Sequence, residues 1–412
     1  MCLDLLQTTL LQFLSLDKNE PTSQTLSQFS TDQWQALLDL ADGLNVTPLL
    51  HSKLKRKKLD APSHIQQELH RNYLNNTGRN LAIFHAFRQL SAQLQAANIS
   101  MIPLKGVYLA DAIYPTLGER VIGDLDLLVP KDRIEEAIEI GIKCNFLPIK
   151  QVAVDAWLTH SHHVCPQHNA DNGLTVEWHW HIERPQPKNQ IAIQELWERA
   201  APATISDQSV YALAIEDTII HLAYHIAYHH QFLFGIRNLC DLSLICQTHA
   251  AHIDWDAVIQ RARKWQYERG VYLSLLLIQT HLAAPIPTSV LANLNPKGIP
   301  HLPLELATQQ VFISSLQRKN IFPTRSRIYG ANGVRNKWRA LQVSLFPQAE
   351  NIAIWHDVDT SSMSTLARYL IRWRIMFRKA IYKIRGMSWG LTAVSSALKR
   401  KSQLSSWLNA ID

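Results

Sequence analysis

Two aspartates interrupt an otherwise apolar strand pattern in Gly123-Asp-Leu-Asp-Leu-Leu-Val129. Because side chains alternate between the two faces of a strand, Asp124 and Asp126 are expected on the same face, roughly 7 Å apart. Two carboxylates so placed repel each other unless a cation joins them, and Mg²⁺ typically bridges one or two carboxylates to substrate phosphates. The motif favours a magnesium site, although a strand end with solvated acids explains these residues equally well.

Lys105 and Gly106 form a second candidate element of this site. They follow a short apolar segment that predicts a strand, and they precede a helical pattern that extends to Ile113. A glycine at such a junction lets backbone amides approach a phosphate, and the helix N-terminus adds positive potential. The pair therefore indicates contact with a phosphorylated ligand.

A third acid comes from the predicted strand at residues 174–182. Its alternation places Glu177, His179 and His181 on one face and three apolar residues on the other. One face of this strand is therefore expected to carry chemistry, while the other packs in the core.

The segments Leu104-Lys105-Gly106, Arg120 to Asp126 and Glu177-Trp178-His179-Trp180 together resemble a known family. They are similar to nucleotidyltransferases of the DNA polymerase β-like superfamily, in particular to an uncharacterised bacterial family within it. The resemblance covers about residues 80 to 270. The first motif departs from the Gly-Gly or Gly-Ser of many members, and its distance from Asp124 is long.

This resemblance implies an α+β fold, with a polymerase β-like palm and mixed sheet flanked by N-terminal and C-terminal helical regions. Asp124, Asp126 and Glu177 are then the expected catalytic residues and the ligands of Mg²⁺, or of Mn²⁺ in its place. The expected reaction transfers a nucleoside monophosphate from an NTP such as ATP to an unidentified acceptor and releases pyrophosphate. Glu177 is also the expected acceptor of the proton.

The remaining expected site residues are cations and histidines. Lys105, Gly106 and Arg120 are expected to bind the nucleotide, with an ordinary ion pair as the alternative for each of the two cations. His179 and His181 are expected to line the site or to contact the acceptor, because they share the predicted face of Glu177.

A second group of histidines lies in a predicted helix at residues 214–230, where His221, His225 and His229 recur at i, i+4 and i+8. Zinc binding is one interpretation of this spacing. However, His221 and His225 enclose Leu-Ala-Tyr and not the general-base Glu of a zinc protease motif. Packing or substrate contact is therefore the favoured interpretation.

Apolar periodicity divides the chain into four regions. Helical patterns fill residues 1–98, with the longest helix at 63–97, and a mixed pattern at 99–205 is the expected catalytic core. Helices that pack on this core are expected at 206–300, where residues 285–303 are rich in proline and predict a connector. Residues 301–412 form a basic helical region.

The net charge of +7 is unevenly distributed. Residues 321–412 contain 15 Lys and Arg against 4 Asp and Glu, so the rest of the chain is slightly acidic. The basic helix predicted at residues 364–386 has three interpretations: packing on the protein with its charges solvated, contact with an anionic membrane surface, or RNA binding. Packing is favoured, and peripheral membrane contact comes next.

The cysteine pattern and the hydropathy bear on the compartment. Five scattered cysteines without a C-x-x-C pair exclude a disulfide framework and are typical of a reducing environment. The N-terminus lacks the basic segment of a signal peptide, and no apolar stretch reaches the roughly 20 residues that span a bilayer. We therefore expect a cytoplasmic protein without a transmembrane segment, with peripheral attachment to a membrane as an alternative.

Two other functions are compatible with the sequence. One is a noncatalytic nucleotide-binding or scaffold protein that keeps the fold without turnover, although three intact acids argue against it. The other is a toxin-like enzyme that nucleotidylates RNA, which the basic C-terminal region permits.

Overall fold

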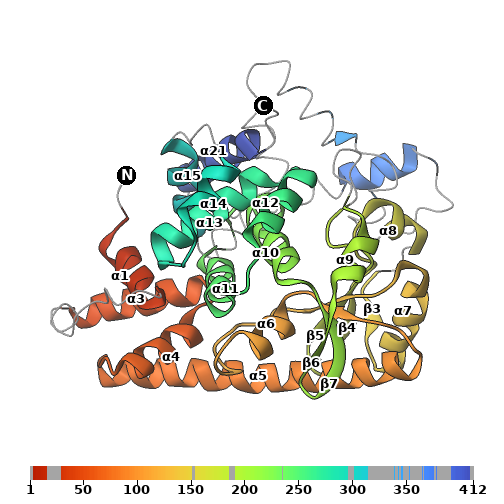
Figure 1. The fold of residues 1–412 in the computed structure, drawn as a ribbon, viewed down its shortest axis with the longest axis horizontal. Coiled ribbons are helices and arrows are strands. Elements are labelled where there is room, and N and C mark those ends of the chain that lie inside the picture. The colour runs from red at the N-terminus through yellow and green to blue at the C-terminus, as the bar shows by residue number, and fades with distance from the viewer. Residues whose placement is uncertain are drawn as a thin grey trace.

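The computed structural model describes residues 3–15, 29–150, 154–184, 191–233, 235–295, 301–313 and 391–408, with short pieces between 338 and 377 (Figure 1). Its strands are β1 (Ile102–Pro103), β2 (Leu125–Leu128), β3 (Leu147–Pro148), β4 (Gln167–Asn169), β5 (Leu174–His179), β6 (Ala201–Ile205) and β7 (Gln208–Ala212). Its N-terminal and central helices are α1 (Leu5–Leu14), α3 (Thr31–Gly43), α4 (Thr47–Lys57), α5 (Ser63–Ala96), α6 (Gly106–Ala112), η1 (Lys131–Arg133), α7 (Ile134–Lys143), α8 (Val154–His160) and α9 (Ile193–Arg199). Its later helices are α10 (Ile215–Tyr224), η2 (His225–His229), α11 (Gly235–Thr248), α12 (Trp255–Lys264), α13 (Glu268–Leu282), α14 (Thr288–Leu294), α15 (His301–Val311) and α21 (Leu391–Leu408).

The longest helix, α5, extends along the base of the molecule in Figure 1, with α4, α6 and the sheet above it. It is 34 residues long, and Ile83, Phe87, Leu90 and Leu94 on its buried face recur at helical spacing. The predicted helix at residues 63–97 is confirmed to within one residue. Its polar Asn76 and Asn80 are buried as well, and they contact the loop that leads to the acidic motif.

The central sheet has the strand order β1-β2-β5-β4-β3. Strands β2 and β5 are parallel, while the other neighbouring pairs are antiparallel. The expected α+β class with a mixed sheet is therefore confirmed, whereas a polymerase β-like palm stays a prediction. Strand β2 begins at Leu125, so Asp124 directly precedes the strand.

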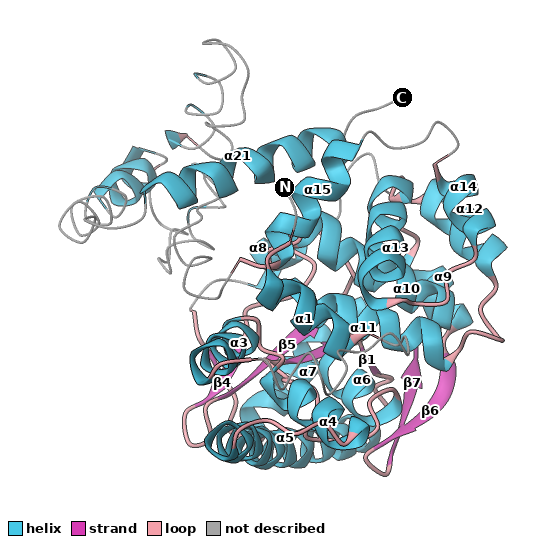
Figure 2. Cartoon of the chain, turned by 90° about the vertical axis from the view of Figure 1, so that its left-hand side faces the viewer, coloured by secondary structure: helices cyan, strands magenta, loops and turns pink. Residues whose placement is uncertain are grey.

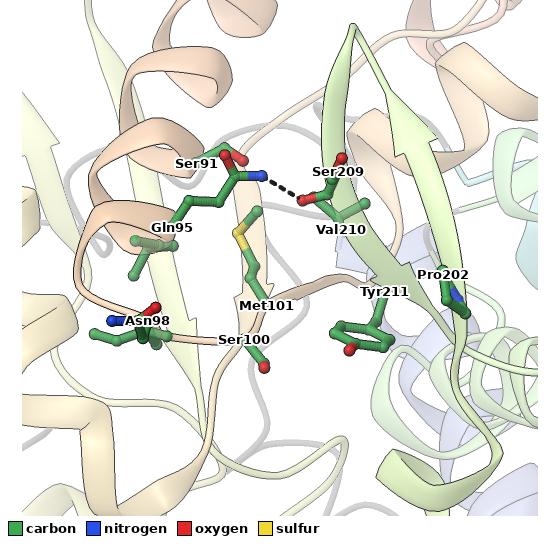
Figure 3. A pocket seen from close by; sticks show the side chains of 11 residues that line it. Ser91, Gln95, Asn98, Ser100, Met101, Pro202, Ser209, Val210 and Tyr211 are labelled. Atoms are coloured by element: carbon green, nitrogen blue, oxygen red, sulfur yellow. Dashed lines mark hydrogen bonds between the residues drawn. The ribbon is translucent and has the colours of Figure 1, made fainter.

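A hairpin formed by β6 and β7, which the sequence patterns did not predict, packs against β1 and α5. The Tyr211 amide of β7 donates to the Met101 carbonyl at 3.0 Å. Between the hairpin and the end of α5 lies a cavity of about 370 Å³ (Figure 3), where the Gln95 amide donates to the Ser209 carbonyl at 2.8 Å. None of the predicted site residues lines this cavity.

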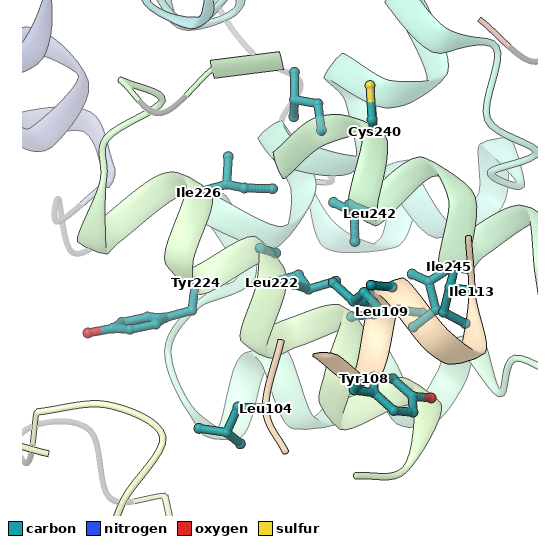
Figure 4. Close-up of a cluster of buried hydrophobic side chains, with 14 of the residues drawn as sticks. Leu104, Tyr108, Leu109, Ile113, Leu222, Tyr224, Ile226, Cys240, Leu242 and Ile245 are labelled. Carbon is teal, nitrogen blue, oxygen red and sulfur yellow. The ribbon is translucent and has the colours of Figure 1, made fainter. Parts of the chain in front are cut away.

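Helices α10 and α11 lie on the side of α6 that faces away from α5, and α12 to α15 lie beyond them, as Figures 1 and 2 show. Leu109 and Ile113 of the α6 region lie in one buried apolar cluster with Leu222 of α10 and Ile245 of α11 (Figure 4). These contacts attach α6 to the later helices, so the element that begins at Gly106 is held from both sides.

The C-terminal third departs from its predictions or lies outside the described residues. The predicted connector at 285–303 is wrong in part, because α14 occupies Thr288–Leu294. Within the predicted basic helix at 364–386, the structure describes residues 366–374 as helical, so its membrane or RNA contact stays a prediction. The four region boundaries also stay predictions. Across the described part of the chain, no helix combines the length and apolarity needed to traverse a membrane.

Candidate active site

The predicted acids meet at the junction of β2 and β5. Asp126 and Glu177 are register partners on these parallel strands, so their side chains are neighbours on one face of the sheet. Asp124 lies two residues before Asp126, at the entrance to β2. Strand pairing thus brings together acids that lie about fifty residues apart in the sequence.

Asp126 is held by two cationic groups. The Lys105 ammonium lies 3.0 Å from its Oδ2 atom, and Nε2 of His179 lies 3.0 Å from its Oδ1 atom. The same His179 nitrogen is 3.5 Å from Oε2 of Glu177, so the imidazole bridges the two acids. Asp126 and His179 are almost fully buried, while Lys105 and Glu177 keep 20% and 23% of their side chains exposed. The site is therefore accessible beside these two residues.

The electrostatics of the site separate its two aspartates. Repulsion from Asp126, followed by burial, raises the pKa of Asp124 to about 6. Burial opposes ionisation of Asp126 as well, but the Lys105 charge and the His179 hydrogen bond hold its pKa well below the usual range. Asp126 is therefore ionised at neutral pH, and the repulsion between the two carboxylates raises the pKa of Asp124.

His179 is cationic in this setting. Burial favours the neutral imidazole, but hydrogen bonds to Asp126 and Glu177 raise the pKa of His179 to about 9. Burial favours the protonated form of Glu177, but the hydrogen bond with His179 favours the ionised form. The net effect is a lowered pKa of Glu177. The arrangement thus provides an ionised Glu177 at the accessible side of the site.

Gly106 brings α6 close to the acidic segment. A Cβ atom at this position would lie 2.9 Å from Cγ2 of Ile122 and 3.1 Å from the Asp124 carbonyl oxygen, so only glycine fits without displacement. The close approach places Lys105, the residue before α6, beside Asp126. Contact of either residue with a nucleotide stays a prediction.

Arg120 lies away from the accessible side. Its Nε and Nη2 atoms donate to the two carboxylate oxygens of Asp241 at 2.9 and 2.8 Å, and the Tyr114 hydroxyl donates to Oδ1 at 2.8 Å. All three groups are buried. These contacts favour the ordinary ion pair that the sequence left open for Arg120, and its binding to a nucleotide stays a prediction.

His181 lies beyond the end of β5, which stops at His179. The predicted strand to residue 182 is therefore too long by three residues. The Nε2 atom of His181 lies 3.2 Å from the Ile191 carbonyl oxygen, and its Nδ1 atom accepts from the Glu183 amide. Its proposed place in the site is untested.

Several positioning residues escaped the sequence patterns. The guanidinium of Arg79 donates to the Ile122 and Gly123 carbonyls, and that of Arg237 donates to the Val121 carbonyl. Buried His162 and half-buried His163 have ring centroids 5.2 and 5.3 Å from that of His179. A signal for Asn76 and Asn80 was present in the sequence, since they place two polar side chains at i and i+4 on an otherwise apolar helix face. Buried polar groups need hydrogen-bond partners, so this pattern indicates a contact with another segment.

The residues that carry this geometry lie within the match to a known protein family. A model of an uncharacterised nucleotidyltransferase family matches residues 30–283, more than half of the chain. Among solved structures, the solution structure of the antibiotic-resistance factor ANT(2″)-Ia is 16% identical, with a TM-score of 0.32, and the alignment covers 49% of this chain and 99% of that one. No curated protein matches. On the family match, the chain belongs to this family of nucleotidyltransferases and is a transferase enzyme.

Proposed function

We propose that the chain transfers a nucleoside monophosphate from an NTP to an acceptor hydroxyl or similar nucleophile, using Asp124, Asp126 and Glu177. The observation that carries this proposal is the direct pairing of Asp126 with Glu177 on parallel strands, next to Asp124 and within the family match. The acceptor forms a bond to the α-phosphorus as the bond from that atom to the bridging oxygen breaks, and pyrophosphate leaves.

The chemistry of the donor set supports a divalent metal ion here. Carboxylate oxygens are the ligands that Mg²⁺ and Mn²⁺ prefer, and one ligand atom each from Asp126, Glu177 and His179 lies within 4.8 Å of the others. The raised pKa of Asp124 reflects a repulsion that a cation would relieve. Asp124, Asp126 and Glu177 would hold the ion. When bound, Mg²⁺ neutralises phosphate charge and activates the nucleophile.

The contacts of Asp126 assign roles to its two cationic neighbours. Each of its oxygens accepts from one donor and keeps a second lone pair for a metal ion, whose positive charge would repel the cationic donors. Lys105 is the freer of the two, since its side chain is 20% exposed and that of His179 only 1%. In our proposal His179 keeps Asp126 in position, while Lys105 turns to a phosphate oxygen of the nucleotide.

Glu177 is the proposed proton acceptor of the reaction. Its carboxylate is ionised and partly exposed, and one of its oxygens lies within 4.8 Å of an oxygen of Asp126. It would take the proton of the acceptor as the new bond to phosphorus forms.

The test compares Asp126→Asn with wild type in transfer of label from an α-labelled NTP, with Mg²⁺ or Mn²⁺ present. We expect loss of transfer. Because the substitution also removes the anionic partner of buried His179 and so lowers stability, circular dichroism at the assay temperature checks that the variant remains folded. Glu139→Gln is the matched control, since this carboxylate is exposed on α7. Transfer by Asp126→Asn at the wild-type rate would exclude the site, and nucleotide binding without pyrophosphate release by wild type would favour the noncatalytic alternative.

A further inference from the structure

A π-helical turn at η2 gathers three histidines next to the acidic site. The His230 amide donates to the His225 carbonyl at 2.9 Å, a bond between residues five positions apart. In a regular α-helix, residue i+5 would lie about 140° around the axis from residue i. The wider turn returns His230 to the side of His225, so one ring nitrogen from each of His225, His229 and His230 lies within 4.8 Å of the other two.

His225 is the buried member of this group. Only 5% of it is exposed, and in the described part of the chain neither of its ring nitrogens has a hydrogen-bond partner. A buried polar atom without a partner lowers stability, and such atoms call for an explanation by an ion, a water or a function. Turns of the π type also occur frequently at functional sites.

The protonation state of the group suits metal binding. Burial, followed by the positive charge of Lys105, lowers the pKa of His225 well below its usual range. Burial and the neighbouring His229 do the same for the pKa of His230. Neutral imidazoles offer a lone pair at neutral pH, so a metal ion need not displace a proton from them.

We propose that His225, His229 and His230 bind a divalent transition-metal ion of the Zn²⁺ class. Imidazole nitrogens suit zinc, cobalt and nickel, whereas Mg²⁺ requires oxygen ligands, so this site is chemically distinct from the carboxylates. His229 is exposed and provides the access route. Three protein ligands leave a fourth position for water or a substrate group.

The site adjoins the proposed catalytic acids. The ring of His162 lies between the two groups, with its centroid 6.0 Å from that of His229 and 5.2 Å from that of His179. A metal ion on the three histidines would therefore fix the turn between α10 and α11 close to Glu177. The spacing in the sequence had suggested His221, His225 and His229, and the π-helical turn adds His230.

The test measures metal binding directly, with the full chain free of any histidine tag and stripped by a chelator. Co²⁺ is titrated and followed by its visible absorption, and Zn²⁺ is then used to displace it. The variants are His225→Gln and His229→Gln. The second replaces an exposed side chain and so leaves the fold intact even where the first does not. His85→Gln, at an exposed histidine of α5, and Asp126→Asn serve as controls.

We expect one Co²⁺ per wild-type chain, displaced by one Zn²⁺, with the same binding in both controls. Loss of a residue that only supports a metal ligand typically lowers metal affinity by roughly 10–100-fold. The His229→Gln variant loses a ligand itself, so its Co²⁺ affinity should fall by more than this. Absence of binding by wild type, wild-type affinity in His229→Gln, or loss of binding in Asp126→Asn would each overturn the proposal. Since binding is read without nucleotide, its failure is distinguishable from failure of the transfer reaction.

Discussion

Burial of Glu183 should make the stability of the protein depend on pH. It follows β5, its side chain is buried, and among the described residues neither carboxylate oxygen has a hydrogen-bond partner. Burial raises the pKa of Glu183 to about 8, from a usual value of about 4.5. The folded protein therefore holds a proton on Glu183 that the unfolded chain releases between these two values.

The sign and size of the effect follow from this difference. The pKa of Glu183 is higher in the folded protein than in the unfolded chain. The free energy of unfolding therefore decreases as pH rises from about 4.5 through about 8. At about 1.4 kcal/mol for each pKa unit, the loss between pH 5 and pH 7 is on the order of 2–3 kcal/mol. Glu183→Gln removes the titration, so this part of the pH dependence should vanish.

The measurement is the free energy of unfolding in urea at pH 5, 6, 7 and 8 for wild type and Glu183→Gln. The exposed Glu139→Gln variant is the control for loss of a carboxylate. The quantity compared is the change with pH, since a buried amide without partners also lowers stability at every pH. Parallel curves for wild type and Glu183→Gln would refute the reasoning.

Two further predictions concern the frame of the site. Asp241→Asn leaves the buried charge of Arg120 without its bidentate partner and should lower the free energy of unfolding by about 3–5 kcal/mol, as measured in urea. Gly106→Ala places a Cβ atom 3.1 Å from the Asp124 carbonyl oxygen and should reduce label transfer by about 10–100-fold. Gly78→Ala, where the added carbon meets no described atom within 4 Å beyond its own stretch of helix, should keep wild-type transfer.

The sequence predicts elements whose signal is local. The apolar spacing of residues 63–97 identifies α5, because a helix of this length must repeatedly turn one face to the core. Alternation in the acidic strand and in the Glu177 strand likewise predicts which side chains share a face. Asp126, Glu177 and His179 meet for that reason, once β2 and β5 pair in parallel.

Features that depend on distant partners could not be predicted in this way. Arg120 and Asp241 are 121 positions apart, and no local pattern around either residue predicts their contact. The hairpin of β6 and β7 was missed because its turn residues, Ser206 and Asp207, both have positive φ without the glycine that usually signals such a turn. The π-helical turn was also missed, since the same residues fit an α-helical pattern.

The long distance between the first motif and Asp124 has a structural explanation in the loop of residues 113–124. No strand in the described part of the chain pairs with this loop, so its carbonyl groups must find donors elsewhere. Asn76 and Asn80 of α5 donate to the Leu117, Gly118 and Arg120 carbonyls, and Arg79 and Arg237 donate to those from Val121 to Gly123. Two helices far apart in sequence thus replace a strand neighbour. Asp124 can therefore leave the sheet while its backbone stays fixed, as its proposed role as a metal ligand requires.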